Sequence, residues 1–176
     1  QESILKELRY YAEIFGAFVY GSAKYSERIN RLLYRLRVLN QTTCYPFLLH
    51  VFDDYHQGVI DEETVEKILQ FILAYLLRRM VCGVPSNTLR GLFTYLYNRI
   101  FKVASNKQKY YETLNKFLFT VSSKDVIPSA GEFERALQKA NIYGNNALCR
   151  FLLLDIENGD GKEILQAENL TIEHIM

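Results

Sequence analysis

The residues best suited to chemistry lie at the end of the chain, in the run Thr171-Ile172-Glu173-His174-Ile175-Met176. A carboxylate can hold a divalent metal, and a neighbouring imidazole can deprotonate water for attack on a phosphodiester. On a flat strand adjacent side chains point to opposite faces, so Glu173 and His174 can serve one site only where a loop redirects one of them. Nowhere else in the sequence do neighbouring residue types indicate catalysis.

Other catalytic motifs are missing from the sequence. It contains no glycine-rich phosphate loop, no GxSxG turn and no zinc-ligand spacing. The Asp53-Asp54 pair lies near His50 and His56, which is a weak indication of a metal site. The two histidines are six residues apart and do not share a helix face, and we expect His50 to be a hydrogen-bonded, half-buried side chain.

Basic side chains follow one face of a predicted helix, at Lys24, Arg28, Arg31 and Arg35. Such a stripe can lie along a phosphate backbone, and it can equally be a solvated surface. The charge balance of the whole chain leaves the same choice. Residues 1–120 carry 16 Lys and Arg against 11 Asp and Glu, whereas residues 121–176 carry 5 against 9. This asymmetry fits nucleic acid at one end and metal-binding acids at the other, or an ordinary distribution of surface charge.

The elements that must position these residues are predicted to be helices. Of the 176 residues, 49% are hydrophobic and 23% charged, as in soluble globular proteins. Apolar residues recur at helical spacing through most of the chain. They predict an all-α bundle of about seven helices, near residues 3–20, 24–39, 45–57, 62–79, 87–104, 107–121 and 145–158, with a short helix after residue 129. In the first helix the apolar residues at this spacing are Ile4, Leu5, Leu8, Tyr11, Ala12 and Phe15.

The helix that follows Asp61 is the predicted centre of the bundle. Its apolar residues from Val65 to Leu77 occur almost all the way round, which is typical of a helix buried by its neighbours. Asp61 is the predicted N-cap, and Arg78 and Arg79 suit the negative end of the helix. The two arginines are predicted either to contact DNA or another domain, or to cap carbonyls at this helix end.

Local residue types predict several further boundaries. A helix is expected to end before Gly58, and Ser86 is expected to cap the helix near 87–104. Ser129 and Glu132 match a capping box, and residues 158–161 (NGDG) predict a turn. The residues from 164 to 176 are expected to form a short β-strand. The chain would then comprise a helical scaffold domain, residues 1–165, and the truncated start of a second domain, residues 166–176.

The cysteines and hydropathy indicate an intracellular protein. Cys44, Cys82 and Cys149 are far apart and form no CxxC pair, so we expect reduced thiols buried as small apolar groups. The N-terminus lacks the pattern of a signal peptide, and no apolar run reaches the ~18–20 residues that span a bilayer. We therefore expect a cytoplasmic protein with no membrane partner.

Several stretches resemble the C-terminal part of the GmrSD-type family of modification-dependent (type IV) restriction endonucleases. The order and spacing of the pieces carry this resemblance, which covers most of the chain. The pieces are YPFLL at 45–49, GVIDEE at 58–63, YLLRRMVCG at 75–83, IY at 142–143, RFLL at 150–153 with Glu157 following, and TIEHIM at 171–176.

The resemblance implies a larger protein in three parts. A ParB-like nucleotide-hydrolysing domain with a DGQQR-like motif would precede residue 1, and an HNH nuclease domain would follow residue 170. In the HNH site Glu173 would be the metal ligand and His174 the general base, with Mg²⁺ bound in the full-length enzyme. The sequence ends before the proline, the Asn and the second His or Asn that the motif needs. We therefore expect neither bound metal nor cleavage from these 176 residues alone.

Two functions are compatible with these observations. In the first, the chain is the helical scaffold of a DNA restriction endonuclease, and its partners are DNA and the N- and C-terminal domains of the same protein. The candidate contacts with DNA or those domains are Lys24, Arg28, Arg31, Arg35, Arg78 and Arg79. In the second, the chain is a non-enzymatic module that binds another protein or forms a homodimer.

Overall fold

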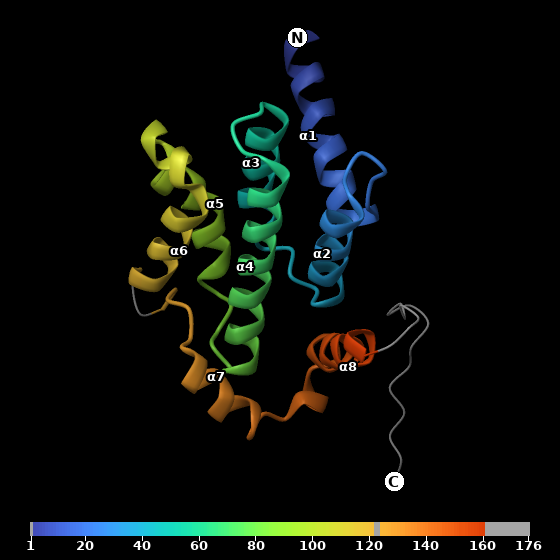
Figure 1. The fold of residues 1–176 in the computed structure, drawn as a ribbon, viewed down its shortest axis with the longest axis vertical. Coiled ribbons are helices and arrows are strands. Elements are labelled where there is room, and N and C mark those ends of the chain that lie inside the picture. The colour runs from blue at the N-terminus through green and yellow to red at the C-terminus, as the bar shows by residue number, and fades with distance from the viewer. Residues whose placement is uncertain (1, 122–123, 161–176) are drawn as a thin grey trace.

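The computed structural model describes residues 2–121 and 124–160, and every regular element in these ranges is a helix (Figure 1). The predicted all-α bundle is therefore confirmed. The α-helices are α1 (Glu2–Tyr20), α2 (Glu27–Val38), α3 (Tyr45–His56), α4 (Glu62–Val81), α5 (Leu89–Phe101), α6 (Tyr110–Thr120), α7 (Ala130–Leu137) and α8 (Asn146–Asp160), and the 3₁₀ helices are η1 (Ala104–Lys109) and η2 (Ile142–Gly144). The predicted strand over residues 164–176, and with it the start of a second domain, lies outside the described residues.

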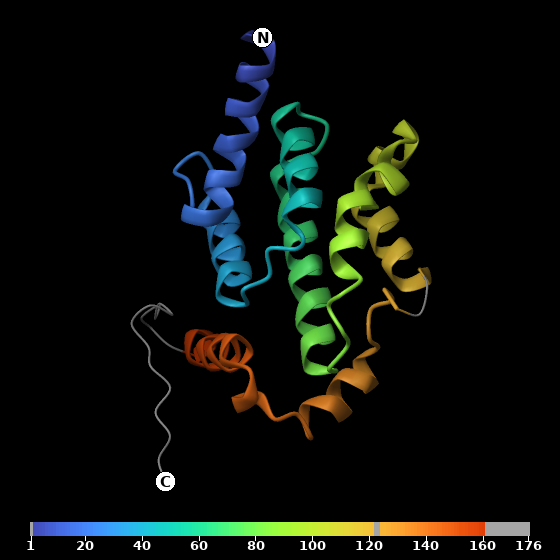
Figure 2. The ribbon, with the colours of Figure 1, turned by 180° about the vertical axis from the view of Figure 1, so that it is seen from behind.

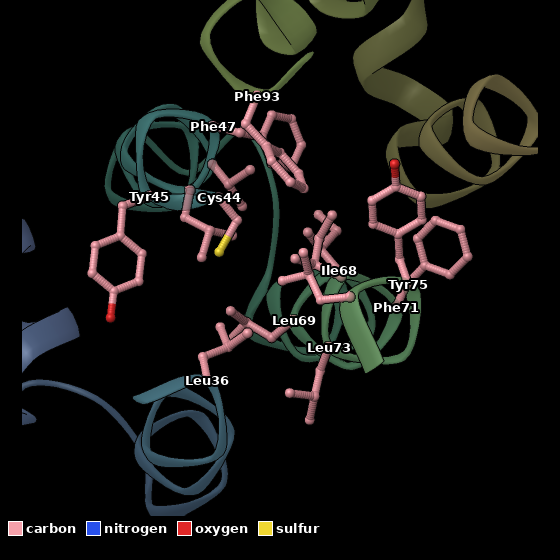
Figure 3. Close-up of a cluster of buried hydrophobic side chains, with 14 of the residues drawn as sticks. Leu36, Cys44, Tyr45, Phe47, Ile68, Leu69, Phe71, Leu73, Tyr75 and Phe93 are labelled. Atoms are coloured by element: carbon pink, nitrogen blue, oxygen red, sulfur yellow. The ribbon is translucent and has the colours of Figure 1, made fainter. Parts of the chain in front are cut away.

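Helix α4 is the centre of the bundle, as its apolar pattern predicts. It packs against α2, α3, α6, α7 and α8. The ribbon views show α1 and α2 on one side of it and α5 and α6 on the other (Figure 2). Leu36 of α2, Phe47 of α3 and Phe93 of α5 extend toward the space beside α4, where Leu69 lies (Figure 3). All four are fully buried, and burial of such side chains is the main source of stability in a bundle of this kind.

Several predicted helix boundaries are confirmed by the hydrogen bonds at the helix ends. The Thr64 N–H donates to Asp61 Oδ1 at 2.9 Å, so Asp61 caps α4. Ser129 and Glu132 form the reciprocal capping box at the start of α7. Gly58, just after α3, has a φ of +71°, a left-handed conformation that glycine adopts without strain.

Two predicted boundaries are wrong. Ser86 does not cap α5, because that helix begins only at Leu89, after Thr88; the Leu89 N–H donates to the backbone carbonyl of Ser86 at 3.0 Å. Residues 158–160 continue α8 and do not form a turn. A helix already anchored by the buried Phe151 and Leu154 can extend through an Asn-Gly pair, since glycine costs only about 1 kcal/mol inside a helix.

Helix α1 forms as predicted but buries a different face. Its buried residues are Ile14, Ala17 and Phe18. The predicted apolar face is largely uncovered in the first turns, where Ile4, Leu5 and Leu8 are 61%, 66% and 62% exposed. Figures 1 and 2 show the reason: the N-terminal part of α1 projects beyond the neighbouring helices.

The state of the cysteines and the lengths of the apolar helices are also predicted from the sequence. Cys44 and Cys149 are buried and Cys82 is half-buried, and all three are free thiols. Among the residues that the structure describes, no helix combines the length and the apolar character needed to cross a bilayer.

Candidate nucleic-acid interface

The basic stripe predicted on α2 is largely neutralised by carboxylates of the same chain. Three of its members make ion pairs with three different helices: Lys24 with Glu13 of α1, Arg28 with Glu66 of α4, and Arg35 with Asp155 of α8. The separation is 2.8 Å for the first pair and 3.8 Å for the second. Arg31 is exposed and has no carboxylate within ion-pair distance among residues 2–121 and 124–160.

Arg35 acts as a link between α2 and α8. Its guanidinium carbon lies 5.2 Å from the centroid of the Phe151 ring, and a terminal nitrogen pairs with Asp155. Together with Arg31 these side chains line a hollow of about 170 Å³ between the two helices. The charge and the apolar stem of Arg35 are both used to hold α8 in place.

Arg78 and Arg79 bond to backbone carbonyls in other segments of the chain. Arg79 is only 1% exposed and donates to the carbonyls of Lys124, at 2.8 Å, and of Pro85, at 2.9 Å. Arg78 donates to the carbonyl of Pro128 at 3.2 Å. The prediction that the two arginines bond to carbonyls is confirmed, but the predicted acceptors are wrong. The carbonyls belong to the connections after α4 and α6 and not to the last turn of α4. Arg79 offers no surface to a phosphate.

The six predicted contact residues consequently do not form one surface of free cations, because three are paired with carboxylates and Arg79 is buried. Their partners come from α1, α4, α8 and two connecting segments. Glu173 and His174, the pair predicted to be catalytic, lie outside the described residues. Within the described part of the chain, no group of three or more His, Cys, Asp or Glu side chains is placed to hold a metal ion.

The Asp53-Asp54 pair is used in two separate hydrogen-bond networks. Asp54 is 4% exposed and accepts from the Lys107 ammonium at 2.7 Å and from the hydroxyls of Tyr97 and Tyr110 at 2.8 and 3.0 Å. Lys107 also donates to the Tyr97 oxygen at 2.6 Å. The carboxylate of α3 thereby receives donors from α5, η1 and α6, and it fixes the start of η1–α6 against the bundle.

The electrostatics of this network favour a charged lysine beside neutral tyrosines. Burial opposes the charge of Lys107, but its hydrogen bonds with Asp54 and Tyr97 outweigh that cost and raise the pKa of Lys107. Burial and the nearby Asp54 carboxylate both raise the pKa of Tyr110. Tyr97 is shifted in the same direction, chiefly by burial. The groups are locked in one protonation state, which suits a structural link better than proton transfer.

The second network joins α1, α3 and the loop before α2 through His56. The Tyr10 hydroxyl donates to Asp53 Oδ1 at 2.9 Å, so its oxygen can only accept from His56 Nδ1, 3.2 Å away. His56 Nε2 then accepts from the Tyr25 hydroxyl at 3.0 Å. Burial lowers the pKa of His56, in agreement with this neutral tautomer.

His50 is half-buried and stacks on Tyr97, with ring centroids 4.5 Å apart, and burial lowers its pKa as well.

The structure also reveals a group of cations that the sequence reasoning missed. Residues 1–88 carry ten Lys and Arg and ten Asp and Glu, so the basic excess of the helical body lies in residues 89–121, with six basic residues and one acidic one. Lys107 is held by Asp54. The other five are exposed on α5, on η1, on α6 and just after α5: Arg90, Arg99, Lys102, Lys109 and Lys116. The sum of charges over residues 1–120 hides this group. A separate sum for each predicted helix would have located it.

Comparison of the chain with protein-family models, with curated proteins and with solved structures found no match.

Proposed function

We propose that this chain is the DNA-contacting helical scaffold of a modification-dependent restriction endonuclease. The observation that carries the proposal is the concentration of unneutralised positive charge on residues 89–121, where six basic residues face one acidic residue. None of the five exposed cations there makes an ion pair with a carboxylate of the described residues. Cations that the protein leaves unpaired can replace the counterions of a phosphate backbone, and this gives salt-sensitive affinity without sequence preference.

The role as a scaffold, apart from DNA contact, is supported by the rigidity of the helical bundle. Helix α4 is buried on several sides, and the Asp54 network ties η1 and α6 to α3. A bundle fixed in this way can hold a DNA-binding surface and the flanking domains in a constant relationship.

Catalysis is proposed for the full-length protein only. There, phosphodiester hydrolysis by an HNH domain would be coupled to nucleotide hydrolysis by the preceding domain. In that site Glu173 would hold Mg²⁺ and His174 would deprotonate water. The support for these roles is the resemblance of residues 171–176 to the first strand of an HNH site.

Duplex-DNA binding followed by fluorescence anisotropy tests the scaffold proposal. We expect binding at low salt that weakens steeply as salt rises; no binding even at low salt would remove DNA contact from this chain.

The nuclease role has a separate test, because the residues that follow Met176 in the parent gene should include a proline and then Asn and His. Their absence would exclude an HNH site. A metal-dependent nuclease assay on the full-length protein should lose activity in His174→Ala.

A second function, a protein-binding or dimerisation module, is favoured by the uncovered apolar residues of α1. Ile4, Leu5 and Leu8 lie within about one turn of one another and are each more than half exposed. Clustered apolar side chains of this kind often mark an interaction surface. Sedimentation equilibrium distinguishes this function: association that Leu8→Glu abolishes would support it, and a monomer at all concentrations would exclude self-association.

A further inference from the structure

We propose that one face of the α5–α6 hairpin, here called the hairpin face, binds the phosphate backbone of duplex DNA. The hairpin face consists of Tyr95, Arg99, Lys102, Lys109 and Lys116. This inference rests on the proposed function and names the surface that would carry it. It replaces the stripe on α2, where three of the four cations are paired within the chain.

Helical spacing places the residues of the hairpin face together. Tyr95, Arg99 and Lys102 are four and then three residues apart, so they follow one side of α5. Lys109 directly precedes α6 and Lys116 lies seven residues later, two turns on along the same side. Tyr95 is 62% exposed, and the four cations are exposed as well.

A contact between the two helices joins these rows into one surface. The Arg99 guanidinium carbon lies 5.5 Å from the centroid of the Phe117 ring, so the basic row of α5 faces across to α6. Each row is about 10 Å long at 1.5 Å per residue, and packed helices lie about 8–10 Å apart. Long side chains on two such rows can reach the phosphates on both sides of a major groove about 12 Å wide.

Two charged residues of the same segment mark the limits of the hairpin face. Lys107 lies outside it, because its ammonium is bound by Asp54 and Tyr97. Arg90 is nine residues before Arg99, two and a half turns, and therefore lies on the opposite side of α5. Substitution of either residue should leave the affinity for duplex DNA unchanged, although both lie in the basic segment.

Glu112 is the single acidic residue of segment 89–121. Its substitution should raise the affinity for DNA, whereas substitution of a cation should lower it. Glu112 is exposed and lies four residues before Lys116, on the same side of α6. It makes no ion pair with that lysine in the described structure. A carboxylate at this position would repel a bound phosphate, so its removal should strengthen binding.

The experiment compares two variants with equal loss of charge. Arg99→Gln/Lys102→Gln/Lys116→Gln removes three cations of the hairpin face. Lys24→Gln/Arg28→Gln/Arg31→Gln removes three cations of the predicted basic stripe, of which Lys24 lies just before α2. The slope of log K against log salt should become less negative by about 3 in the first variant, because each lost phosphate contact changes it by roughly 0.9. It should stay unchanged in the second. Thermal unfolding followed by circular dichroism verifies that both variants fold.

Single substitutions complete the test. Arg99→Gln should weaken binding and Arg90→Gln should leave it unchanged, while Glu112→Gln should tighten it. The inference is overturned if the α2 variant loses affinity and the hairpin variant does not, and in that outcome the proposed DNA function stands. It is also overturned if duplex RNA binds as tightly as duplex DNA and depends on the same three cations. Failure of the unaltered chain to bind any duplex at low salt would instead reject the proposed function itself.

Discussion

The Lys107 ammonium lies 2.7 Å from Asp54 Oδ1, although 53 residues separate the two in sequence, and this ion pair ties η1 to α3. The carboxylate is 6% exposed at the side chain and the lysine 25%. A buried charge that loses its partner is strongly destabilising, because it remains desolvated without compensation. The pair therefore gives the most specific stability prediction for this fold.

Lys107→Met should lower the free energy of unfolding by on the order of 3 kcal/mol, measured by urea denaturation. The methionine keeps the apolar stem but leaves Asp54 with hydroxyl donors only. Lys67→Met is the matched control, since Lys67 pairs with Glu63 on the exposed surface of α4, and exposed pairs contribute little. Equal effects of the two substitutions would contradict the structural role of the Asp54 network.

Arg79→Met should be similarly costly, by about 3 kcal/mol, because it removes two charge-assisted hydrogen bonds and leaves the carbonyls of Pro85 and Lys124 without these donors. Arg79→Lys should rescue little of this loss, since one ammonium does not reproduce the planar fork of the guanidinium. Urea denaturation of both variants measures the difference. Near-complete rescue by lysine would show that charge alone is needed at this position.

Stability should fall as the pH decreases below about 6.5, the ordinary pKa of histidine. Burial lowers the pKa of His56 in the folded state, so the unfolded chain binds more protons in the interval between the folded and unfolded pKa values. His50 contributes in the same direction. Thermal unfolding between pH 7 and pH 5 measures the effect, and His56→Gln should flatten part of the slope. An unchanged slope in that variant would exclude His56 as a source.

The two faces of α1 should respond very differently to truncation. Phe18 is fully buried, and Phe18→Ala should cost about 3–5 kcal/mol. Leu8 is 62% exposed, and Leu8→Ala should change stability by less than about 0.5 kcal/mol. A large loss of stability in Leu8→Ala would mean that its face is covered in solution, as the alternative function as a protein-binding module requires.

The parts of the fold that the sequence predicts well are governed by local chemistry. Asp61 and Ser129 cap their helices because a side-chain oxygen is two or three residues from a free amide, which is a strictly local condition. The central position of α4 follows from apolar residues on all its sides. Neither conclusion needs knowledge of distant residues.

The remaining features depend on neighbours that the sequence does not specify. An apolar stripe at Ile4, Leu5 and Leu8 indicates a face but not whether another helix covers it. The partners of Asp54 come from three later elements, so no spacing rule brings them together. The α2 stripe has the pattern of a phosphate-binding face, yet its carboxylate partners lie on other helices. Only these ion pairs show that most of the α2 stripe is neutralised.

The salt dependence of duplex-DNA binding by the unaltered chain is the most direct test of DNA contact. If Arg99, Lys102, Lys109 and Lys116 each replace one counterion, log K should fall linearly with log salt, with a slope of about −3.6, at roughly −0.9 per contact. A slope near zero, or no binding at about 50 mM salt, would contradict the claim that this helical bundle is a DNA-contacting scaffold.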